Sequence, residues 1–186
     1  MQNNLQLTWQ QERFCVSHDY RFIYVPIPKV ACTSLKVLVA MCNNETSCLT
    51  KFRPLLHSYV NKTMTLSTYE YEKTIQLLDN KDYFKFTFCR NPYHRLVSAY
   101  YSKFFKLIGY KKIKDEAKQA AKEVVQIIRG KELSESELTE SITFTEFIHY
   151  LSVTDDLALN IHWQPQHLII DGITLRANSH FLENKV

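Results

Sequence analysis

The sequence predicts an α/β domain with three layers, in which a mainly parallel central sheet is flanked by helices. Two apolar runs rich in aromatic and β-branched residues, 22–25 and 83–89, have the length and composition of core strands. Each run leads into a segment with helical spacing of apolar residues, at 35–41 and at 93–108. Strands that alternate with helices favour a parallel sheet, and ligands bind such sheets at the carboxyl ends of the strands.

The length and composition indicate one globular domain. The chain has 186 residues, of which 45% are hydrophobic, and it contains 11 Tyr and 11 Phe. These values are typical of a packed core rather than of a disordered chain. No linker rich in Gly, Ser or Pro divides the sequence. We therefore expect a single domain over residues 1–186, with an N-terminal extension at 1–20, a helical and polar insertion at 111–142 and a shortened C-terminal region.

The sequence contains no run of 18 or more apolar residues, and residues 1–12 lack the pattern of a signal peptide. We therefore expect no transmembrane segment and a cytoplasmic location, while peripheral membrane contact and oligomeric state stay open. The 5 cysteines lack the spacing of metal ligands, so we expect reduced thiols and no metal. A bridge between Cys42 and Cys48 is the alternative.

The net charge of +4 conceals an asymmetry along the chain. Residues 1–114 contain 17 Lys and Arg against 7 Asp and Glu, whereas residues 115–186 contain 6 against 12. A basic region of this kind favours an anionic ligand or substrate, although a solvated surface would give the same count. No module of interleaved basic and aromatic residues is present, so we expect no nucleic-acid partner.

The first strand-to-helix junction, residues 26–36, has the composition of an anion-binding loop. A helix start offers unpaired backbone N–H groups and the positive end of its dipole. Lys29 adds a full charge, and Thr33 and Ser34 add hydroxyl donors. The segment is not a Walker A loop, because it has no glycine; Ala31 is small but does not adopt positive φ freely. The alternative is an ordinary turn with Thr33 as the helix N-cap.

The segment between the two junctions is less regular. Leu55–Val60 indicates a short strand within the mixed region 50–62. Ser67 and Glu70 have the spacing of a capping box, which predicts a helix that ends near Leu78.

The second junction follows the strand at 83–89 and again places a cation and a hydroxyl at a helix start. Arg90 precedes Asn91, which suits an N-cap, and Pro92 suits the first helical position. Ser98 lies on the helix. We expect the apolar residues to share one broad face and Arg95 and Lys103 to lie on the opposite face.

The remaining third of the chain predicts two more helices. Apolar residues keep helical spacing over 113–129, and Gly130 can close this helix. Residues 131–140 predict a solvated loop. Thr143 and Glu146 then form a second predicted capping box, before a helix that starts at Phe144.

The two junctions together resemble the carbohydrate sulfotransferases that use 3′-phosphoadenosine 5′-phosphosulfate (PAPS), of the branch with chondroitin 4-O- and HNK-1 sulfotransferases. Residues 28–34, Pro-Lys-Val-Ala-Cys-Thr-Ser, are similar to the family's 5′-phosphosulfate loop, and residues 90–100 are similar to its 3′-phosphate motif. Weaker matches are 144–147, 162–164 and 182–184. The resemblance implies a P-loop-like fold and transfer of a sulfuryl group from PAPS to a hydroxyl of a poly- or oligosaccharide.

The resemblance also implies roles for the motif residues. Lys29 would neutralise the oxygen that bridges sulfur and the 5′-phosphate as charge develops there. Arg90 and Ser98 would hold the 3′-phosphate. The 5′-phosphosulfate would contact the whole first motif: Pro28, Lys29, Val30, Ala31, Cys32, Thr33 and Ser34. PAPS would act as a co-substrate, without a metal ion.

The acceptor hydroxyl requires a general base, and His57 occupies the region in which members of this branch have a histidine. A neutral imidazole, with a pKa near ~6.5, suits this task. The competing candidates are Glu45, Glu70 and Glu72, of which Glu70 is better explained by capping and Glu45 by a loop.

The candidate contacts with the carbohydrate acceptor are Arg95, Lys103, His162 and Trp163. Each has a simpler alternative: a solvated helix face for the two cations and the hydrophobic core for Trp163.

The sequence departs from the family in one respect that bears on its location. Animal members of the secretory pathway carry a membrane anchor and paired cysteines after the His-Trp-Gln element, whereas residues 166–170 contain none. This departure would fit a cytosolic, bacterial version; the alternative is a Golgi-lumen fragment of an anchored enzyme.

Two other functions compete with sulfuryl transfer. One is a P-loop-type nucleotide kinase, against which the missing Gly-x-x-x-x-Gly-Lys-Ser/Thr sequence argues. The other is a non-catalytic protein that binds a nucleotide or an anionic glycan.

Overall fold

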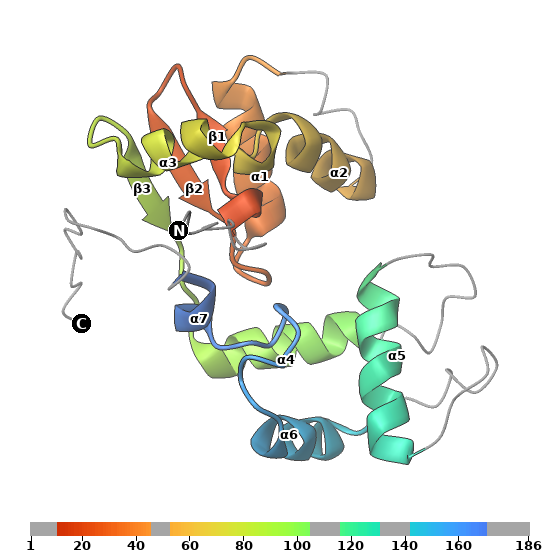
Figure 1. The fold of residues 1–186 in the computed structure, drawn as a ribbon. Coiled ribbons are helices and arrows are strands. Elements are labelled where there is room, and N and C mark those ends of the chain that lie inside the picture. Colours follow the sequence, from red (N-terminus) through yellow and green to blue (C-terminus); the bar gives the residue numbers. More distant parts are fainter. Residues whose placement is uncertain (1–10, 46–52, 105–115, 131–141, 171–186) are drawn as a thin grey trace, which may run out of the picture. The chain divides into compact units, whose positions relative to one another are not determined.

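The computed structural model describes residues 11–45, 53–104, 116–130 and 142–170 (Figure 1). The chain divides into two compact units: the first comprises residues 1–89 and 167–186, and the second comprises residues 90–166. None of the helices in the described ranges is long and apolar enough to cross a lipid bilayer.

The first unit is built on a three-stranded sheet with the order β1-β2-β3. β1 (Cys15–Ser17) pairs antiparallel with β2 (Phe22–Val25), and β2 pairs in parallel with β3 (Phe84–Thr87), with Phe22 opposite Phe84. The two predicted strands are therefore confirmed as β2 and β3, and so is an α/β fold. The described part of the sheet is mixed, with one antiparallel and one parallel pair of strands.

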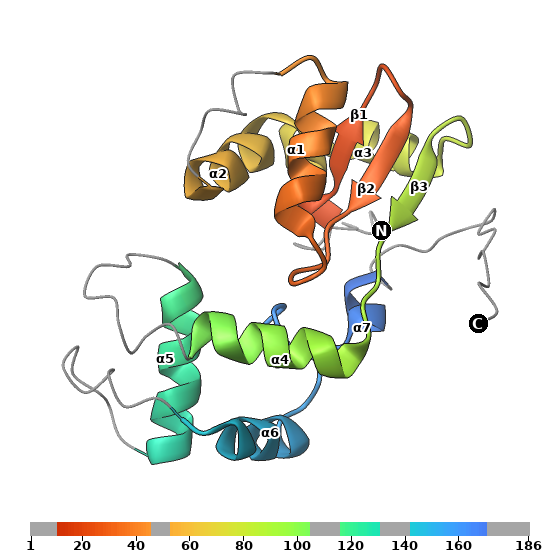
Figure 2. The same cartoon turned by 180° about the vertical axis from the view of Figure 1, so that it is seen from behind.

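Helices cover both faces of this sheet (Figures 1 and 2). α1 (Cys32–Cys42) and α2 (Arg53–Thr63) pack on the face that carries Tyr24. α3 (Tyr71–Asp79) packs on the face that carries Ile23. Because successive strand residues point to opposite faces, β2 contributes side chains to both hydrophobic cores.

The helix α2 shows that the predicted short strand at Leu55–Val60 is wrong. Leu56, Val60 and Met64 are all buried, at intervals of four residues. Residues four apart share one face of a helix, whereas a strand would need alternate residues on its buried face. The apolar spacing in this segment therefore has the helical period.

The predicted capping box of Ser67 and Glu70 is also wrong. Residues Leu66–Thr68 form a short 3₁₀ turn, η3, as Gln11–Arg13 (η1) do near the start of the chain. Helix α3 begins only after Glu70, which is the N-cap residue but makes no side-chain capping bond. The Ser67 hydroxyl lies 2.8 Å from Thr65 Oγ1 instead.

The second unit is a helical cluster of α4 (Pro92–Lys103), α5 (Glu116–Arg129) and α6 (Phe144–Val153). Its core is formed by Ala99, Tyr100, Phe104, Ala121, Val124, Val125, Ile142, Phe147, Tyr150, Leu159 and Trp163. α4 ends at Lys103, so the predicted extension towards residue 108 lies mostly outside the described residues, as does the predicted loop at 131–140.

Two predicted helix ends in the second unit are confirmed. The Thr143 hydroxyl accepts from Glu146 N at 3.2 Å, and the Glu146 carboxylate accepts from Thr143 N at 2.7 Å. Gly130 follows α5 with a φ of 64°, a conformation that glycine adopts without steric cost. After α6, the chain reaches the short helix α7 (Gln166–Ile170), whose first residue belongs to the second unit.

The expected exposure of Arg95 and Lys103 is wrong, because both side chains are buried, with exposed fractions of 2% and 9%. Arg95 Nη1 donates to Gln164 O and Nη2 donates to Ile161 O, each at 2.7 Å. The planar guanidinium thus satisfies two carbonyl groups of the segment before α7. Its burial supports a structural role for Arg95 rather than contact with an acceptor.

We predict that Arg95→Ala lowers the free energy of unfolding by about 3 kcal/mol, because it leaves two buried carbonyl groups without a donor. The matched control is Arg129→Ala, since Arg129 forms an exposed ion pair with Glu146 at 2.5 Å. Removal of an exposed pair should cost less than about 1 kcal/mol. Urea denaturation measures both changes, and equal midpoints for the two variants would contradict the assigned role of Arg95.

Candidate functional site

The loop between β2 and α1 contains two residues in the left-handed region, Lys29 with a φ of 68° and Ala31 with a φ of 52°. This conformation costs a non-glycine residue roughly 1–3 kcal/mol, and residues that keep it cluster at ligand-binding sites. Left-handed residues in such loops turn successive N–H groups towards one concave surface that binds anions. Ala31 thus has a positive φ although its methyl group makes this conformation unfavourable.

The start of α1 supplies further donors to this loop. Ala31 is the N-cap residue, and its methyl group makes no capping hydrogen bond. Thr33 lies inside the helix, so the alternative that it serves as the N-cap is wrong. Without a capping side chain, the N–H groups of the first turn and the positive end of the helix dipole suit an anionic ligand.

The other residues of the predicted motif occupy different environments. Pro28 and Lys29 are half-buried, whereas Ser34 is exposed in the first turn of α1. Val30 is buried, and its N–H donates to Ile27 O at 3.3 Å, so Val30 stabilises the loop itself.

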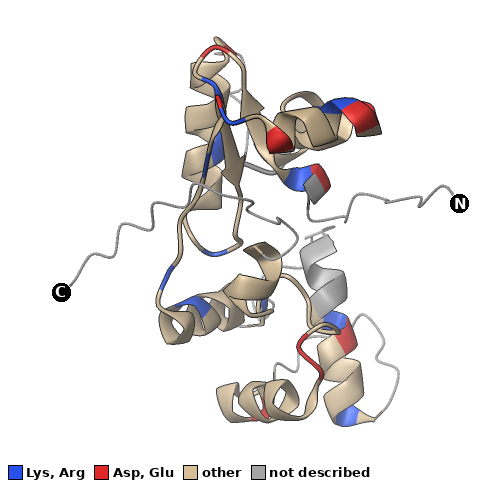
Figure 3. Cartoon of the chain, turned by 60° about the vertical axis from the view of Figure 1, so that its left-hand side comes forward, with Lys and Arg blue, Asp and Glu red and all other residues tan. Residues whose placement is uncertain are grey.

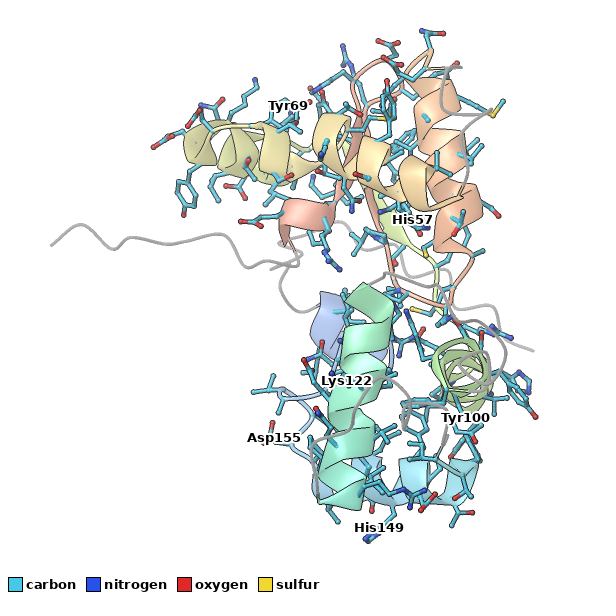
Figure 4. The ribbon with its side chains drawn as sticks, turned by 90° about the vertical axis from the view of Figure 1, so that its right-hand side faces the viewer. His57, Tyr69, Tyr100, Lys122, His149 and Asp155 are labelled. Carbon is cyan, nitrogen blue, oxygen red and sulfur yellow. The ribbon has the colours of Figure 1, made fainter. Side chains whose placement is uncertain are left out.

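His57 lies next to the predicted motif, although it comes from a different helix. Its Nε2 is 2.9 Å from Thr33 Oγ1, which joins α2 to the first turn of α1. Figure 4 shows His57 on the side of α2 that faces α1. This distance is within the range needed for proton exchange between an imidazole and a hydroxyl.

A second hydrogen bond holds the same two helices together. Lys36 Nζ donates to Asn61 Oδ1 at 2.5 Å, and the Lys36 side chain is only 6% exposed. Burial lowers the pKa of Lys36 below its usual value. Thr33 and Lys36 are one turn apart on α1, as His57 and Asn61 are on α2, so the two bonds fix the register of the helices.

The competing carboxylates have other surroundings. Glu45 accepts a hydrogen bond from Tyr59 Oη at 2.6 Å. Glu70 and Glu72 belong to the start of α3, which covers the face of the sheet opposite to α1 and α2. Among these candidates, His57 is the residue that the fold brings to the loop.

At the start of α4, unlike at the start of α1, a side chain accepts hydrogen bonds from the backbone N–H groups of the first turn. The Asn91 side chain accepts from Tyr93 N at 3.0 Å and from His94 N at 3.2 Å, which confirms the predicted N-cap. Pro92 has no N–H group. An anion at this helix start would therefore have to be bound mainly by side chains rather than by the backbone of α4.

Sequence reasoning missed one residue beside Arg90. The carboxamide of Gln166 donates to Arg90 O at 2.7 Å and accepts from Arg90 N at 3.0 Å. The two residues are 76 positions apart, and no local pattern in the sequence connects them.

Two candidate acceptor contacts lie near the end of the second unit. Trp163 is 2% exposed and packs against Phe104 and Phe147, so the structure assigns it to the core. His162 is half-buried, and its Nδ1 lies 2.7 Å from Asn160 Oδ1.

Both candidate anion-binding segments lack acidic residues. Residues 26–34 and 87–103 contain no Asp or Glu, and Figure 3 shows Lys and Arg on each. Within the described ranges, no three His, Cys, Asp or Glu side chains are grouped so that they could hold a metal ion. The described cysteines, Cys15, Cys32, Cys42 and Cys89, are not in disulfides.

Comparison with known proteins finds one protein family and relatives that all carry the name sulfotransferase. The model of the Sulfotransferase family matches residues 12–176. Carbohydrate sulfotransferase 14 of Mus musculus is 33% identical over 154 residues, which cover 81% of this chain and 37% of the relative. The same protein of Danio rerio is 32% identical over 159 residues, covering 83% and 40%. Carbohydrate sulfotransferase 11 of Rattus norvegicus is 31% identical over 162 residues, covering 80% and 42%.

The chain thus spans less than half the length of these relatives. No solved structure gives a significant match. The family model covers most of the chain, including both strand-to-helix junctions, His57 and Gln166. The chain therefore belongs to the Sulfotransferase family, in the branch that includes carbohydrate sulfotransferases 14 and 11.

Proposed function

We propose that this protein transfers a sulfuryl group from PAPS to a hydroxyl group of a carbohydrate. The loop before α1 binds the 5′-phosphosulfate, and Arg90 and Ser98 bind the 3′-phosphate. The observation that carries this proposal is the contact of His57 with Thr33, beside a strained loop and an uncapped helix start. The family of the chain and the names of its relatives support the same reaction.

The proposed reaction is one in-line displacement at sulfur. The acceptor oxygen forms a bond to sulfur while the bond from sulfur to the bridging oxygen of the 5′-phosphate breaks. His57 takes the proton of the acceptor hydroxyl, and the bonding electrons leave with adenosine 3′,5′-bisphosphate (PAP). Lys29 and the N–H groups at the start of α1 stabilise the negative charge that develops on this leaving group.

The distance between His57 and Thr33 is consistent with this role. The Thr33 hydroxyl lies at 2.9 Å from the imidazole, as an attacking hydroxyl must. When Thr33 turns its hydroxyl towards the phosphosulfate, Nε2 becomes available to the acceptor. The carboxylate of Glu45, by contrast, accepts a hydrogen bond from Tyr59 rather than from a residue of the motif at 28–34.

Two broader features belong to this proposal. The two compact units belong to one sulfotransferase domain over 1–186, and this domain has a P-loop-like fold with three layers and a mainly parallel central sheet. The relatives come from animals, which favours the Golgi-lumen alternative over the predicted cytoplasmic location.

We predict that PAP raises the melting temperature of the protein and that Arg90→Ala removes most of this increase. A ligand at 100 times its dissociation constant stabilises a protein by about 2.7 kcal/mol. The matched control is Arg129→Ala, which removes an exposed arginine of α5 and should leave the increase intact. If PAP fails to stabilise the well-folded wild type, the proposed function is wrong.

We predict that His57→Ala lowers kcat by roughly 10²–10⁴ while PAP binding persists, because only the general base is lost. Lys29→Ala should lower kcat by roughly 10²–10³, through the loss of leaving-group stabilisation. A base must be unprotonated, so wild-type kcat should fall at acid pH, where an imidazole becomes protonated. Sulfate transfer to a glycan panel measures these rates, and an unchanged acid limb in His57→Ala would exclude this residue as the base.

We predict that PAP protects Cys32 from alkylation and leaves Cys42 unprotected. Both cysteines are half-buried and free, and they lie at opposite ends of the same helix, α1. Only the end with Cys32 faces the proposed 5′-phosphosulfate. Mass spectrometry after brief treatment with iodoacetamide gives the two rates, and equal protection of both thiols would argue against nucleotide binding at the start of α1.

A further inference from the structure

The side chain of Gln166 forms two hydrogen bonds with the backbone of a single residue, Arg90. Nε2 donates to Arg90 O at 2.7 Å, and Oε1 accepts from Arg90 N at 3.0 Å. Both atoms of the carboxamide are used, as in the pairing of neighbouring strands. A side chain that pairs with both peptide groups of one residue limits the rotation of that residue's φ and ψ.

Arg90 needs such a restraint because of its position in the chain. It lies after the end of β3 and before Asn91, in a segment without regular secondary structure. On its C-terminal side, Asn91 is fixed by its bonds to Tyr93 N and His94 N. Gln166 supplies the corresponding restraint at Arg90 itself.

The restraint on Arg90 matters because the backbone donors at the start of α4 are already bonded to the Asn91 side chain. The Asn91 side chain occupies the N–H groups of Tyr93 and His94, and Pro92 has none. A phosphate group at this helix start depends on the guanidinium of Arg90, which is rigid and always charged. The direction of the Arg90 side chain then decides how well a phosphate is bound.

We propose that Gln166 is a positioning residue that holds Arg90 in the orientation that recognises the 3′-phosphate of the nucleotide. This inference rests on the proposed function, because it takes Arg90 as the ligand of that phosphate. In this role Gln166 acts through its two hydrogen bonds with the backbone of Arg90. It therefore tunes the preference for a nucleotide that carries a 3′-phosphate over one that does not.

The test compares binding of PAP with binding of adenosine 5′-phosphate, which lacks the 3′-phosphate. Gln166→Met keeps the length of the side chain and removes both hydrogen bonds. We expect it to weaken PAP binding about tenfold and to change binding of adenosine 5′-phosphate less than about twofold. Gln76→Met, at an exposed position of α3, is the matched control and should change neither affinity.

A double-mutant cycle separates positioning from a general effect on stability. In the Arg90→Ala background, Gln166→Met should have no further effect on PAP affinity, since it acts through Arg90. Equal weakening of both nucleotides, or additive effects of the two substitutions, would show that Gln166 only supports the fold. Either result overturns the proposal.

The outcome for the wild type distinguishes this inference from the proposed function. If the wild type binds both nucleotides equally, the assignment of Arg90 to a 3′-phosphate fails, and the inference fails with it. If the wild type prefers PAP and Gln166→Met keeps the full preference, only the role of Gln166 is wrong. Isothermal titration calorimetry gives each affinity, and circular dichroism checks that each variant is folded.

Discussion

The hydrogen bond between Lys36 and Asn61 is the interaction on which the candidate site of the first unit depends. A buried ammonium group is costly unless a polar group satisfies it, so α1 and α2 must meet where Asn61 reaches Lys36. Once this contact is made, one turn towards the start of both helices brings His57 to Thr33. The buried Lys36 thus sets the position of the His57 imidazole, although the two residues are 21 positions apart in the sequence.

The two helix starts that follow β2 and β3 use their backbone donors differently. α1 begins without a capping side chain, so its first N–H groups are suited to a ligand. At α4, the Asn91 side chain accepts from the corresponding groups. In the proposed function, selectivity at this junction therefore depends on the side chain of Arg90. Backbone donors bind any tetrahedral anion, whereas a positioned guanidinium discriminates by direction and distance. In the proposed function, the first junction therefore binds the group that reacts, and the second junction distinguishes the nucleotide by its 3′-phosphate.

Much of this arrangement follows from local sequence patterns, and the remainder depends on contacts between distant segments. β2, β3 and the caps at Asn91 and Thr143 were predictable because each depends on neighbouring residues. The helix α2 was missed because the six residues Leu55–Val60, which mix apolar and polar side chains, are too few to distinguish a strand from a helix. The burial of Arg95 was missed because its partners lie 66 and 69 residues further along the chain.

The left-handed residues of the loop before α1 have a thermodynamic consequence. Glycine-rich phosphate loops reach such conformations without steric cost, but they lose much backbone entropy when they become ordered. With Lys29 and Ala31 at these positions, both effects have the opposite sign. The folded loop carries steric strain, but it loses less backbone entropy on ordering, because a non-glycine chain has less conformational freedom when unfolded. A loop of this kind is preorganised before its ligand arrives, so less of the binding free energy is spent on ordering it. The entropy lost on ordering the backbone contributes to the binding free energy in proportion to temperature. The affinity of this loop for its ligand should therefore change less with temperature than the affinity of a flexible glycine-rich loop.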